Sequence, residues 1–93
     1  MAEIEVKGRK TENGWEFEVE VKEGNTKTRH KVRVNRSFYQ KITQAKTPPE
    51  TLVKKSFEFL LEREPAESIL PEFNLEQISG YFPEYQEEIV SKL

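Results

Sequence analysis

The sequence contains no cysteine and no aspartate, and its only histidine is His30. A chain without cysteine has no disulfide, no thiolate nucleophile and no thiolate metal ligand, which fits a reducing compartment. With glutamate as the only acid and a single histidine, most of the residues that usually perform acid–base catalysis or bind metals are also missing. We therefore expect a protein that is not an enzyme and that uses no metal and no cofactor.

Long apolar runs and glycine-rich loops are missing as well. No run reaches the length of a signal peptide or a membrane span, so we expect a cytoplasmic protein that does not enter a membrane. The four glycines are scattered singly, so no loop of the kind that cradles phosphates is present, and no small-molecule site is evident. The 93 residues suit one domain, residues 1–93, whose small core must be filled largely by aromatic side chains, 11% of the chain.

Three stretches of alternating apolar and charged side chains occupy the first third of the chain. The clearest runs from Trp15 to Lys22, and residues 3–10 and 27–35 alternate in the same way. A period of two is typical of a strand with one face in a core and the other in water. Because the connections are short, we predict a three-stranded antiparallel β-meander in the order 1-2-3 over residues 1–35.

The turns set the expected register of this meander. Asn13-Gly14 is a favoured pair in a two-residue type I′ hairpin turn, and a second short turn follows the middle strand. With these loops, Glu20 lies between Lys7 and Arg29, and the other outward glutamates of the middle strand also have basic neighbours. We therefore expect an ion-paired outer face and an apolar inner face.

The same register puts His30 on the inner face in the row of Gly8, where the missing side chain leaves room for an imidazole. A catalytic or metal-binding histidine needs a nucleophile, a second histidine or a convergent carboxylate. Lys10 and Glu12 share the inner face but form no recognised arrangement with it. A packed structural histidine is the simpler interpretation, and the sequence leaves the role of His30 open.

From residue 36 onward the hydrophobic pattern has a helical period, with buried stripes three and four residues apart. Thr47-Pro48-Pro49-Glu50 is a start signal that combines an N-cap threonine with a capping box. The expected helices cover residues 36–45, Pro49 to about Glu64, Asn74 to Phe82, and the chain from Pro83 onward. The predicted fold class is α+β, with three or four helices from residues 36–93 packed on one face of the meander.

The net charge of −2 hides an uneven distribution. Residues 1–20 carry three bases and six acids, and residues 47–93 carry four bases and ten acids. Between them, residues 21–46 carry eight bases and one acid. A basic middle between acidic flanks is the one charge pattern in this chain that points to a partner.

The basic segment begins with Arg29-His30-Lys31-Val32-Arg33-Val34 and continues through Ser37–Ala45 and Thr47–Glu64. This order of a basic strand and two helices resembles the ribbon-helix-helix DNA-binding family over about residues 28–64. In that family a strand pair, one strand from each subunit of a dimer, enters the major groove with its outward side chains. The resemblance implies a dimeric DNA-binding protein that uses residues 28–34. The nucleic-acid contacts in this interpretation are Arg29, Lys31, Arg33 and Arg36.

The same bases have a simpler interpretation, in which they face water and pair with the glutamates of the middle strand. Those glutamates would neutralise the bases and repel phosphates, so nucleic acid would then not be a partner. Strand propensity and charge pairing are enough to account for these residues, and this is the interpretation that we favour.

The acidic, aromatic C-terminal third offers a second candidate surface. Tyrosine and phenylalanine are enriched in the centres of protein interfaces, although a domain of this size also needs aromatic residues for its own core. The candidate partner residues are Phe73, Tyr81, Phe82 and Tyr85. Together with the open edges of the first and third strands, they favour a small protein-interaction or adaptor module that binds a protein partner or itself. The sequence does not specify the partner, the oligomeric state or the biological process.

Overall fold

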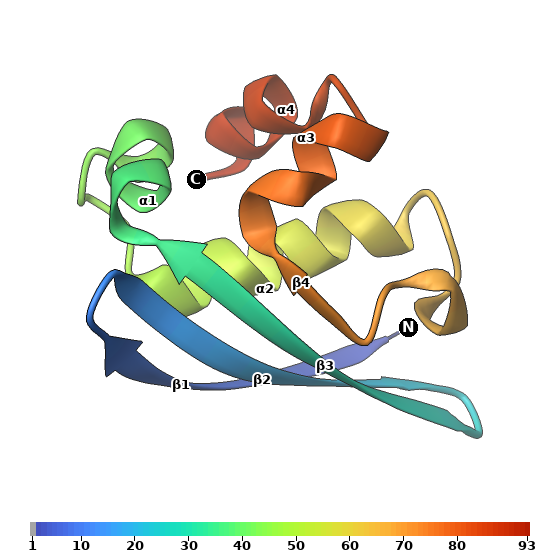
Figure 1. The fold of residues 1–93 in the computed structure, drawn as a ribbon. Helices are drawn as coiled ribbons and strands as arrows, with labels where there is room; N and C mark the ends of the chain where they lie inside the picture. The colour runs from blue at the N-terminus through green and yellow to red at the C-terminus, as the bar shows by residue number, and fades with distance from the viewer. Residues whose placement is uncertain (1) are drawn as a thin grey trace.

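A four-stranded sheet forms one layer of the structure, a computed structural model that describes residues 2–93. Its strands are β1 (Glu3–Thr11), β2 (Gly14–Glu23), β3 (Thr26–Asn35) and β4 (Glu72–Asn74). They lie side by side in the order β1-β2-β3-β4 (Figure 1). The first three strands are antiparallel to their neighbours, whereas β4 runs parallel to β3.

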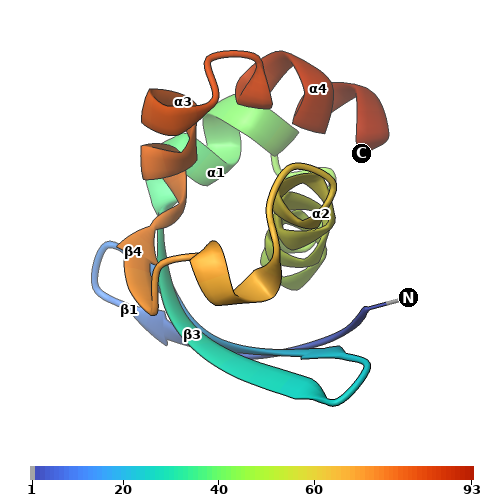
Figure 2. The same cartoon turned by 90° about the vertical axis from the view of Figure 1, so that its right-hand side faces the viewer.

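The second layer is helical. Its elements are α1 (Arg36–Thr43), α2 (Pro49–Leu61), α3 (Ile78–Tyr81) and α4 (Tyr85–Lys92), with two 3₁₀ turns, η1 (Ala66–Ser68) and η2 (Leu75–Gln77). All of them lie on one side of the curved sheet, and α2 lies within its concave side (Figure 2). The α+β class is therefore as the sequence predicts. Within residues 2–93, no helix is both long and apolar enough to cross a membrane.

The predicted register between β2 and β3 is confirmed. Glu16 lies opposite Arg33, Glu18 opposite Lys31 and Glu20 opposite Arg29. These six side chains lie on the outer face, away from the helices, and the valines between them on each strand are buried. The turn between the two strands and the alternation on each strand agree on one register, because a slip of one residue would expose the apolar set.

The predicted register between β1 and β2 is wrong by two residues. The two-residue loop is Glu12-Asn13, and Gly14 is already the first residue of β2, opposite Thr11. A Cβ on Gly14 would lie 2.0 Å from the carbonyl oxygen of Val34, so only glycine fits there. Because β3 packs so closely against the start of β2, the turn closes earlier than the Asn13-Gly14 pair suggests.

A shift of two residues keeps every side chain on its predicted face but changes its neighbours. Gly8 lies opposite Phe17, and His30 lies opposite Val19 instead of in the row of Gly8. A Cβ on Gly8 would lie 2.2 Å from two ring carbons of Phe17. The space above Gly8 is therefore filled by the Phe17 ring and not by the imidazole, an arrangement in which an aromatic ring covers an edge glycine.

The strand β4 is absent from the predicted three-stranded meander, so the all-antiparallel prediction is incomplete. Val32 of β3 pairs with Phe73 of β4, and the backbone N–H of Lys31 donates to the carbonyl of Pro71 at 2.7 Å. The imidazole Nδ1 of His30 lies 2.8 Å from the carbonyl oxygen of Leu70, one residue earlier. Three residues bounded by a proline and a helix cap are too short to show a period of two, so this strand left no pattern in the sequence.

The helix boundaries show which start signals are used. Asn74 forms the capping box at η2, with its side chain accepting from Glu76 and the Gln77 side chain accepting from the Asn74 backbone. At α2 the cap residue is Pro48 and no side-chain cap is present, so the capping box expected at Thr47 does not form. The fixed φ of the two prolines is enough to start that helix.

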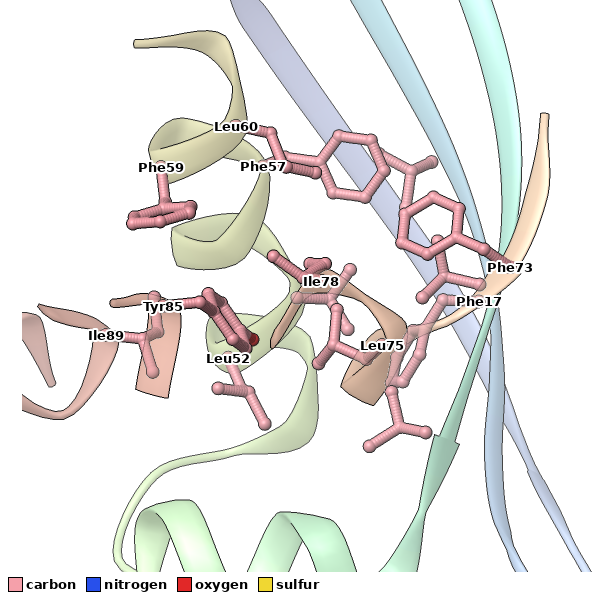
Figure 3. Close-up of a cluster of buried hydrophobic side chains, with 14 of the residues drawn as sticks. Phe17, Leu52, Phe57, Phe59, Leu60, Phe73, Leu75, Ile78, Tyr85 and Ile89 are labelled. Atoms are coloured by element: carbon pink, nitrogen blue, oxygen red, sulfur yellow. The ribbon is translucent and has the colours of Figure 1, made fainter. Parts of the chain in front are cut away.

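The core lies between the sheet and the helices (Figure 3). Phe57 of α2 packs against Phe73 of β4, and both are buried. Tyr85 of α4 is fully buried too, and its hydroxyl lies 2.6 Å from the hydroxyl of Ser56 on α2. Burial raises the pKa of the Tyr85 phenol well above its ordinary value. This pair joins α2 and α4 through the centre of the helical layer.

We expect Gly8→Ala to lower the free energy of unfolding by about 1–3 kcal/mol, the usual cost of overpacking, because the added methyl must displace the buried Phe17 ring. Gly80→Ala is the matched control, since a Cβ on Gly80 meets no atom within 4 Å and alanine favours the helix that contains it. Urea unfolding followed by circular dichroism measures both. Equal stabilities for the two variants would contradict the close approach of Phe17 to Gly8.

Candidate functional site

Three of the four bases that the sequence singles out for nucleic acid, Arg29, Lys31 and Arg33, lie on the outer face of the sheet, where glutamates pair with the two arginines. The guanidinium of Arg29 is 3.4 Å from Glu20, and that of Arg33 is 3.8 Å from Glu16 and 3.0 Å from Glu72. Arg33 therefore joins β2, β3 and β4 across the outer face. These contacts use the positive charge that a phosphate would need.

A shallow depression of about 400 Å³ lies on the same face. Its charged lining is balanced, since three acids and three bases contribute to it. They are Glu5, Glu18, Glu20, Lys7, Arg29 and Lys31. Arg36, the fourth predicted contact, is exposed at the start of α1. An evenly mixed surface attracts neither a polyanion nor a polycation.

The pairing of β3 bears on the ribbon-helix-helix resemblance. Residues 31–33 of β3 are paired with β2 on one side and with β4 on the other, both in the same chain. A ribbon made from the β3 strands of two subunits would require β4 to leave its place. The segment β3–α1–α2 thus has the strand–helix–helix order of that family without its free strand edge.

An apolar groove of about 280 Å³ lies between the end of α2, the chain that leads into β4, and the η2–α3 segment. We call it the α2–α3 groove. Seven of its ten lining residues are apolar or aromatic. The lining residues are Leu60, Glu64, Ser68, Ile69, Leu70, Phe73, Gln77, Ile78, Tyr81 and Phe82.

The rim of this groove leaves large apolar side chains in water. Tyr81 is 66% exposed and Leu70 is 42% exposed, and both line the groove. Only two other large hydrophobic residues of the described chain are comparably exposed, Val90 and Leu93 on the C-terminal helix and end. A cluster of exposed apolar groups around a hollow is typical of an interaction site, whereas single exposed residues are ordinary.

The charge around the groove has one sign. Glu64 is the only charged residue in its lining. Residues 64–93, which supply most of the groove, contain seven glutamates and one lysine. The groove therefore lies in a negative field that a basic ligand would favour.

A contact from β3 positions the segment between α2 and β4, which supplies part of the groove lining. After α2 ends at Leu61, the chain turns back toward β3, and the His30 imidazole holds the Leu70 carbonyl there. The second ring nitrogen of His30 lies 2.9 Å from the hydroxyl of Thr28. His30 is thus buried and bonded at both nitrogens, as the structural interpretation predicts, and it presents no free ring nitrogen to a substrate.

The four residues predicted for a partner surface divide into two groups. Phe73, Tyr81 and Phe82 line the α2–α3 groove, Phe73 as its buried floor and Tyr81 at its open rim. Tyr85 lies in the core and does not line the groove. Sequence reasoning missed Leu60 and Leu70; the signal for Leu70 was its place in an apolar pair between two prolines, Pro65 and Pro71.

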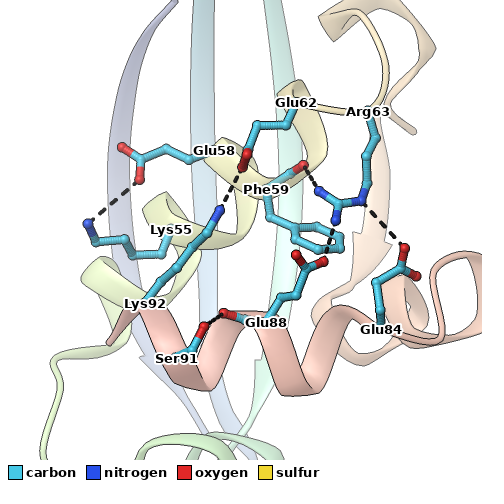
Figure 4. A network of polar contacts seen from close by, with 9 residues as sticks. All are labelled: Lys55, Glu58, Phe59, Glu62, Arg63, Glu84, Glu88, Ser91 and Lys92. Atoms are coloured by element: carbon cyan, nitrogen blue, oxygen red, sulfur yellow. Dashed lines mark hydrogen bonds and ion pairs between the residues drawn. The ribbon is translucent and has the colours of Figure 1, made fainter.

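A polar network joins the C-terminal end of α2 to α4 (Figure 4). The guanidinium of Arg63 lies over the Phe59 ring, 3.7 Å from its centroid, and donates to the Phe59 carbonyl. It also pairs with Glu84 at 3.7 Å, just before α4, and with Glu88 on α4. This arginine ties the end of α2 to the last helix through charge and through its contact with the ring.

The second tie between these helices is the pair of Glu62 and Lys92, whose charged atoms are 2.6 Å apart. The hydrogen bond and charge of Lys92 hold the pKa of Glu62 below its ordinary value. A lowered carboxyl pKa stabilises the folded state above that group's ordinary pKa, and the contribution is lost as the pH falls through the lowered value.

Among residues 2–93, no three side chains of histidine, cysteine, aspartate or glutamate are grouped so that they could hold a metal ion. Every buried polar side-chain atom of these residues has a hydrogen-bond partner. The α2–α3 groove, an apolar hollow with exposed side chains on its rim, is the candidate site.

Comparison of this chain with protein-family models, with curated proteins and with solved structures finds no match.

We expect Lys92→Gln to raise the pKa of the Glu62 carboxyl back toward its ordinary value, because the charge and the hydrogen bond that lower it are removed. Carboxyl-detected NMR titration measures this pKa directly. Lys55→Gln is the control, since Lys55 pairs with Glu58 on the same helix at 3.7 Å and not with Glu62. An unchanged Glu62 pKa in Lys92→Gln would mean that the α2–α4 pair does not form in solution.

Proposed function

We propose that this domain is a non-catalytic protein-interaction module, and that the α2–α3 groove binds an apolar segment of a protein partner flanked by basic residues. The observation that supports this most directly is the exposure of Tyr81 and Leu70 around an apolar hollow in an acidic part of the surface. Burying such side chains is the main source of affinity in protein interfaces.

The size of the groove favours side chains of a peptide over a whole small molecule. Its volume is about 280 Å³ and it is open on one side. Small-molecule sites usually enclose about 300–1,000 Å³ and cover most of the ligand. One or two apolar side chains of a partner would fill this groove, with the rest of the partner lying over the rim.

The charge of the surroundings favours basic flanks on that partner. Glu64 lies in the groove lining, and residues 62–93 contain eight glutamates and only two bases, Arg63 and Lys92. Those two bases are already paired with Glu88 and Glu62. Lysine or arginine residues beside the apolar anchors would therefore gain favourable interactions that speed association, and acidic flanks would be repelled.

We expect an amphipathic peptide of leucine and lysine to bind the domain, and the same peptide with glutamate for lysine to bind at least tenfold more weakly, about 1.4 kcal/mol. Calorimetry measures the affinities, and amide shifts in NMR locate the contact. The shifts should centre on Leu70, Phe73 and Tyr81. Binding that is independent of peptide charge would contradict the acidic-groove proposal.

Variants of the rim separate docking in the groove from non-specific adhesion. We expect Tyr81→Ala and Leu70→Ser to weaken the leucine–lysine peptide at least tenfold each, about 1.4 kcal/mol, because they remove apolar contact at the rim. Val90→Ala is the control, since Val90 is 50% exposed but lies on α4 outside the groove. An equal loss in all three variants would mean that the peptide adheres to apolar residues anywhere on the surface.

Duplex DNA is the competing ligand class, and we expect no binding that falls steeply with salt. Arg29 and Arg33 are held by glutamates, and β3 has no free edge at residues 31–33. Fluorescence anisotropy of a labelled duplex at low salt tests this. An increase in anisotropy that Arg29→Ala abolishes would instead support the ribbon-helix-helix interpretation.

A further inference from the structure

The strand β1 forms a long open edge of the sheet in the part of the chain that the structure describes. It has nine residues, pairs only with β2, and no other strand among residues 2–93 lies on its outer side. On the opposite edge, β3 is covered by β4 at residues 31–33. An uncovered strand of this length presents a row of backbone donors and acceptors that can pair with another strand.

The charges along β1 divide it into two halves. Glu3 and Glu5 lie on the outer face in the first half, and Lys7 and Arg9 lie on the same face in the second half. Within residues 2–93, none of Glu3, Glu5 and Lys7 has an oppositely charged atom within 4 Å. Arg9 pairs with Glu16 at 3.0 Å. Inside the chain Glu5 even faces another acid, Glu20.

We propose that two copies of this chain pair edge to edge through β1, antiparallel, with the two-fold axis at Val6. In this arrangement Glu5 lies opposite Lys7 of the second copy, and Glu3 lies opposite Arg9. Symmetry repeats both pairs, so every outward charge of one strand meets an opposite charge on the other. The pattern of two acids followed by two bases is self-complementary only when the strands are antiparallel.

The charges also select the register. Moving one strand by two residues in one direction brings Lys7 opposite Lys7, and moving it in the other direction brings Glu5 opposite Glu5. A parallel pairing in register puts every charge opposite itself. A slip of one residue would set inward side chains against outward ones and break the face of the sheet. The Val6-centred register is therefore the one that all four charges favour.

The inner face fits the same register. Val6 lies opposite Val6, and Ile4 lies opposite Gly8 of the second copy. Ile4 and Val6 are only half-buried in the single chain and already pack against its core. Gly8 has no side chain of its own on that face, so Ile4 of the second copy would lie beside the Phe17 ring that covers Gly8. The second copy would thus complete the burial of the apolar residues of β1.

The product is a continuous eight-stranded sheet in which β1 of each copy lies at the centre. Leu70 and Phe73 enter the α2–α3 groove from the β4 side, the opposite edge of the sheet. Pairing of two copies through β1 leaves the β4 edge and the groove open to a partner. The dimer and the groove are therefore independent proposals, and the dimer would carry two grooves.

Charge reversal tests the pairing. We expect the wild-type protein to dimerise in sedimentation equilibrium, and Glu5→Lys and Lys7→Glu each to raise the dimer dissociation constant at least about tenfold, since each variant places like charges opposite one another in both symmetric rows. An equimolar mixture of the two variants should regain dimerisation as a heterodimer, because the lysines of one chain then face the glutamates of the other. Circular dichroism confirms that each variant is folded.

Matched controls carry the same charge changes elsewhere. Glu87→Lys on α4 and Lys41→Glu on α1 alter exposed side chains with no ion-pair partner within 4 Å among the described residues, and we expect both to dimerise like the wild type. A second measurement uses the unaltered protein: amide hydrogen exchange of β1 should slow as the protein concentration rises, whereas exchange of β4 should not change.

Three outcomes would overturn the proposal. They are a wild-type protein that is monomeric at millimolar concentration, a dimer that both charge reversals leave intact, or a mixture of the two variants that does not associate. Concentration-dependent protection that appears on β4 or α3 instead of β1 would assign self-association to another surface. None of these results depends on peptide binding in the groove, so failure of one proposal leaves the other open to its own test.

Discussion

The docking of residues 70–74 on the free side of β3 is the interaction on which the rest of the structure depends. Three contacts carry it: the imidazole of His30 holds the Leu70 carbonyl, the Lys31 amide donates to Pro71, and Phe73 pairs with Val32. This single strip of backbone closes one edge of the sheet and places Phe73 against Phe57 in the core. It also brings Leu70 to the rim of the α2–α3 groove, so the site exists because this segment is held in place.

The outer face of the sheet carries many charged side chains, but acids and bases are mixed on it. The glutamates of β2 lie in the centre, each opposite a base of β3, and Glu16 and Glu18 also lie opposite Arg9 and Lys7 of β1. Each such pair contributes only about 0.2–1 kcal/mol, and together they offset part of the positive charge of residues 21–46. The acidic C-terminal third has no such compensation apart from Arg63 and Lys92, which are used within the helical layer. The effective field of the molecule therefore lies around the groove.

The two edges of the sheet have opposite roles. β4 closes one edge with main-chain bonds from the same chain, and it supports a groove whose open rim is apolar. β1 leaves the other edge open, with charges that disfavour indiscriminate strand addition and favour one particular arrangement. A small domain built in this way can offer two surfaces that do not compete, one for a partner and one for a second copy of itself.

Local pattern was enough to predict the parts of the fold that have a period. The alternation around Trp15 to Lys22, the turn after β2 and the helical stripe of α2 gave the α+β class, the β2–β3 register and the side of the sheet that the helices cover. The same reasoning named Phe73, Tyr81 and Phe82, which line the α2–α3 groove, from their aromatic character in an acidic stretch. These features follow from interactions between residues that are near in sequence or share a face.

Tertiary structure alone decided what depends on contacts between distant residues. The carbonyl of Val34 leaves room only for glycine at position 14, the first turn closes one residue earlier than the Asn13-Gly14 pair suggests, and the β1–β2 register shifts by two. Residues 72–74, a segment too short to show a period, form β4 because β3 offers them an edge. Tyr85 and Tyr81 look alike in the sequence, but Tyr85 packs against Phe59 and hydrogen-bonds to Ser56 in the core, whereas Tyr81 lies at the rim of the groove. Residue spacing determined the faces of the elements, whereas steric contact and hydrogen bonding across the fold determined which of those faces became a site.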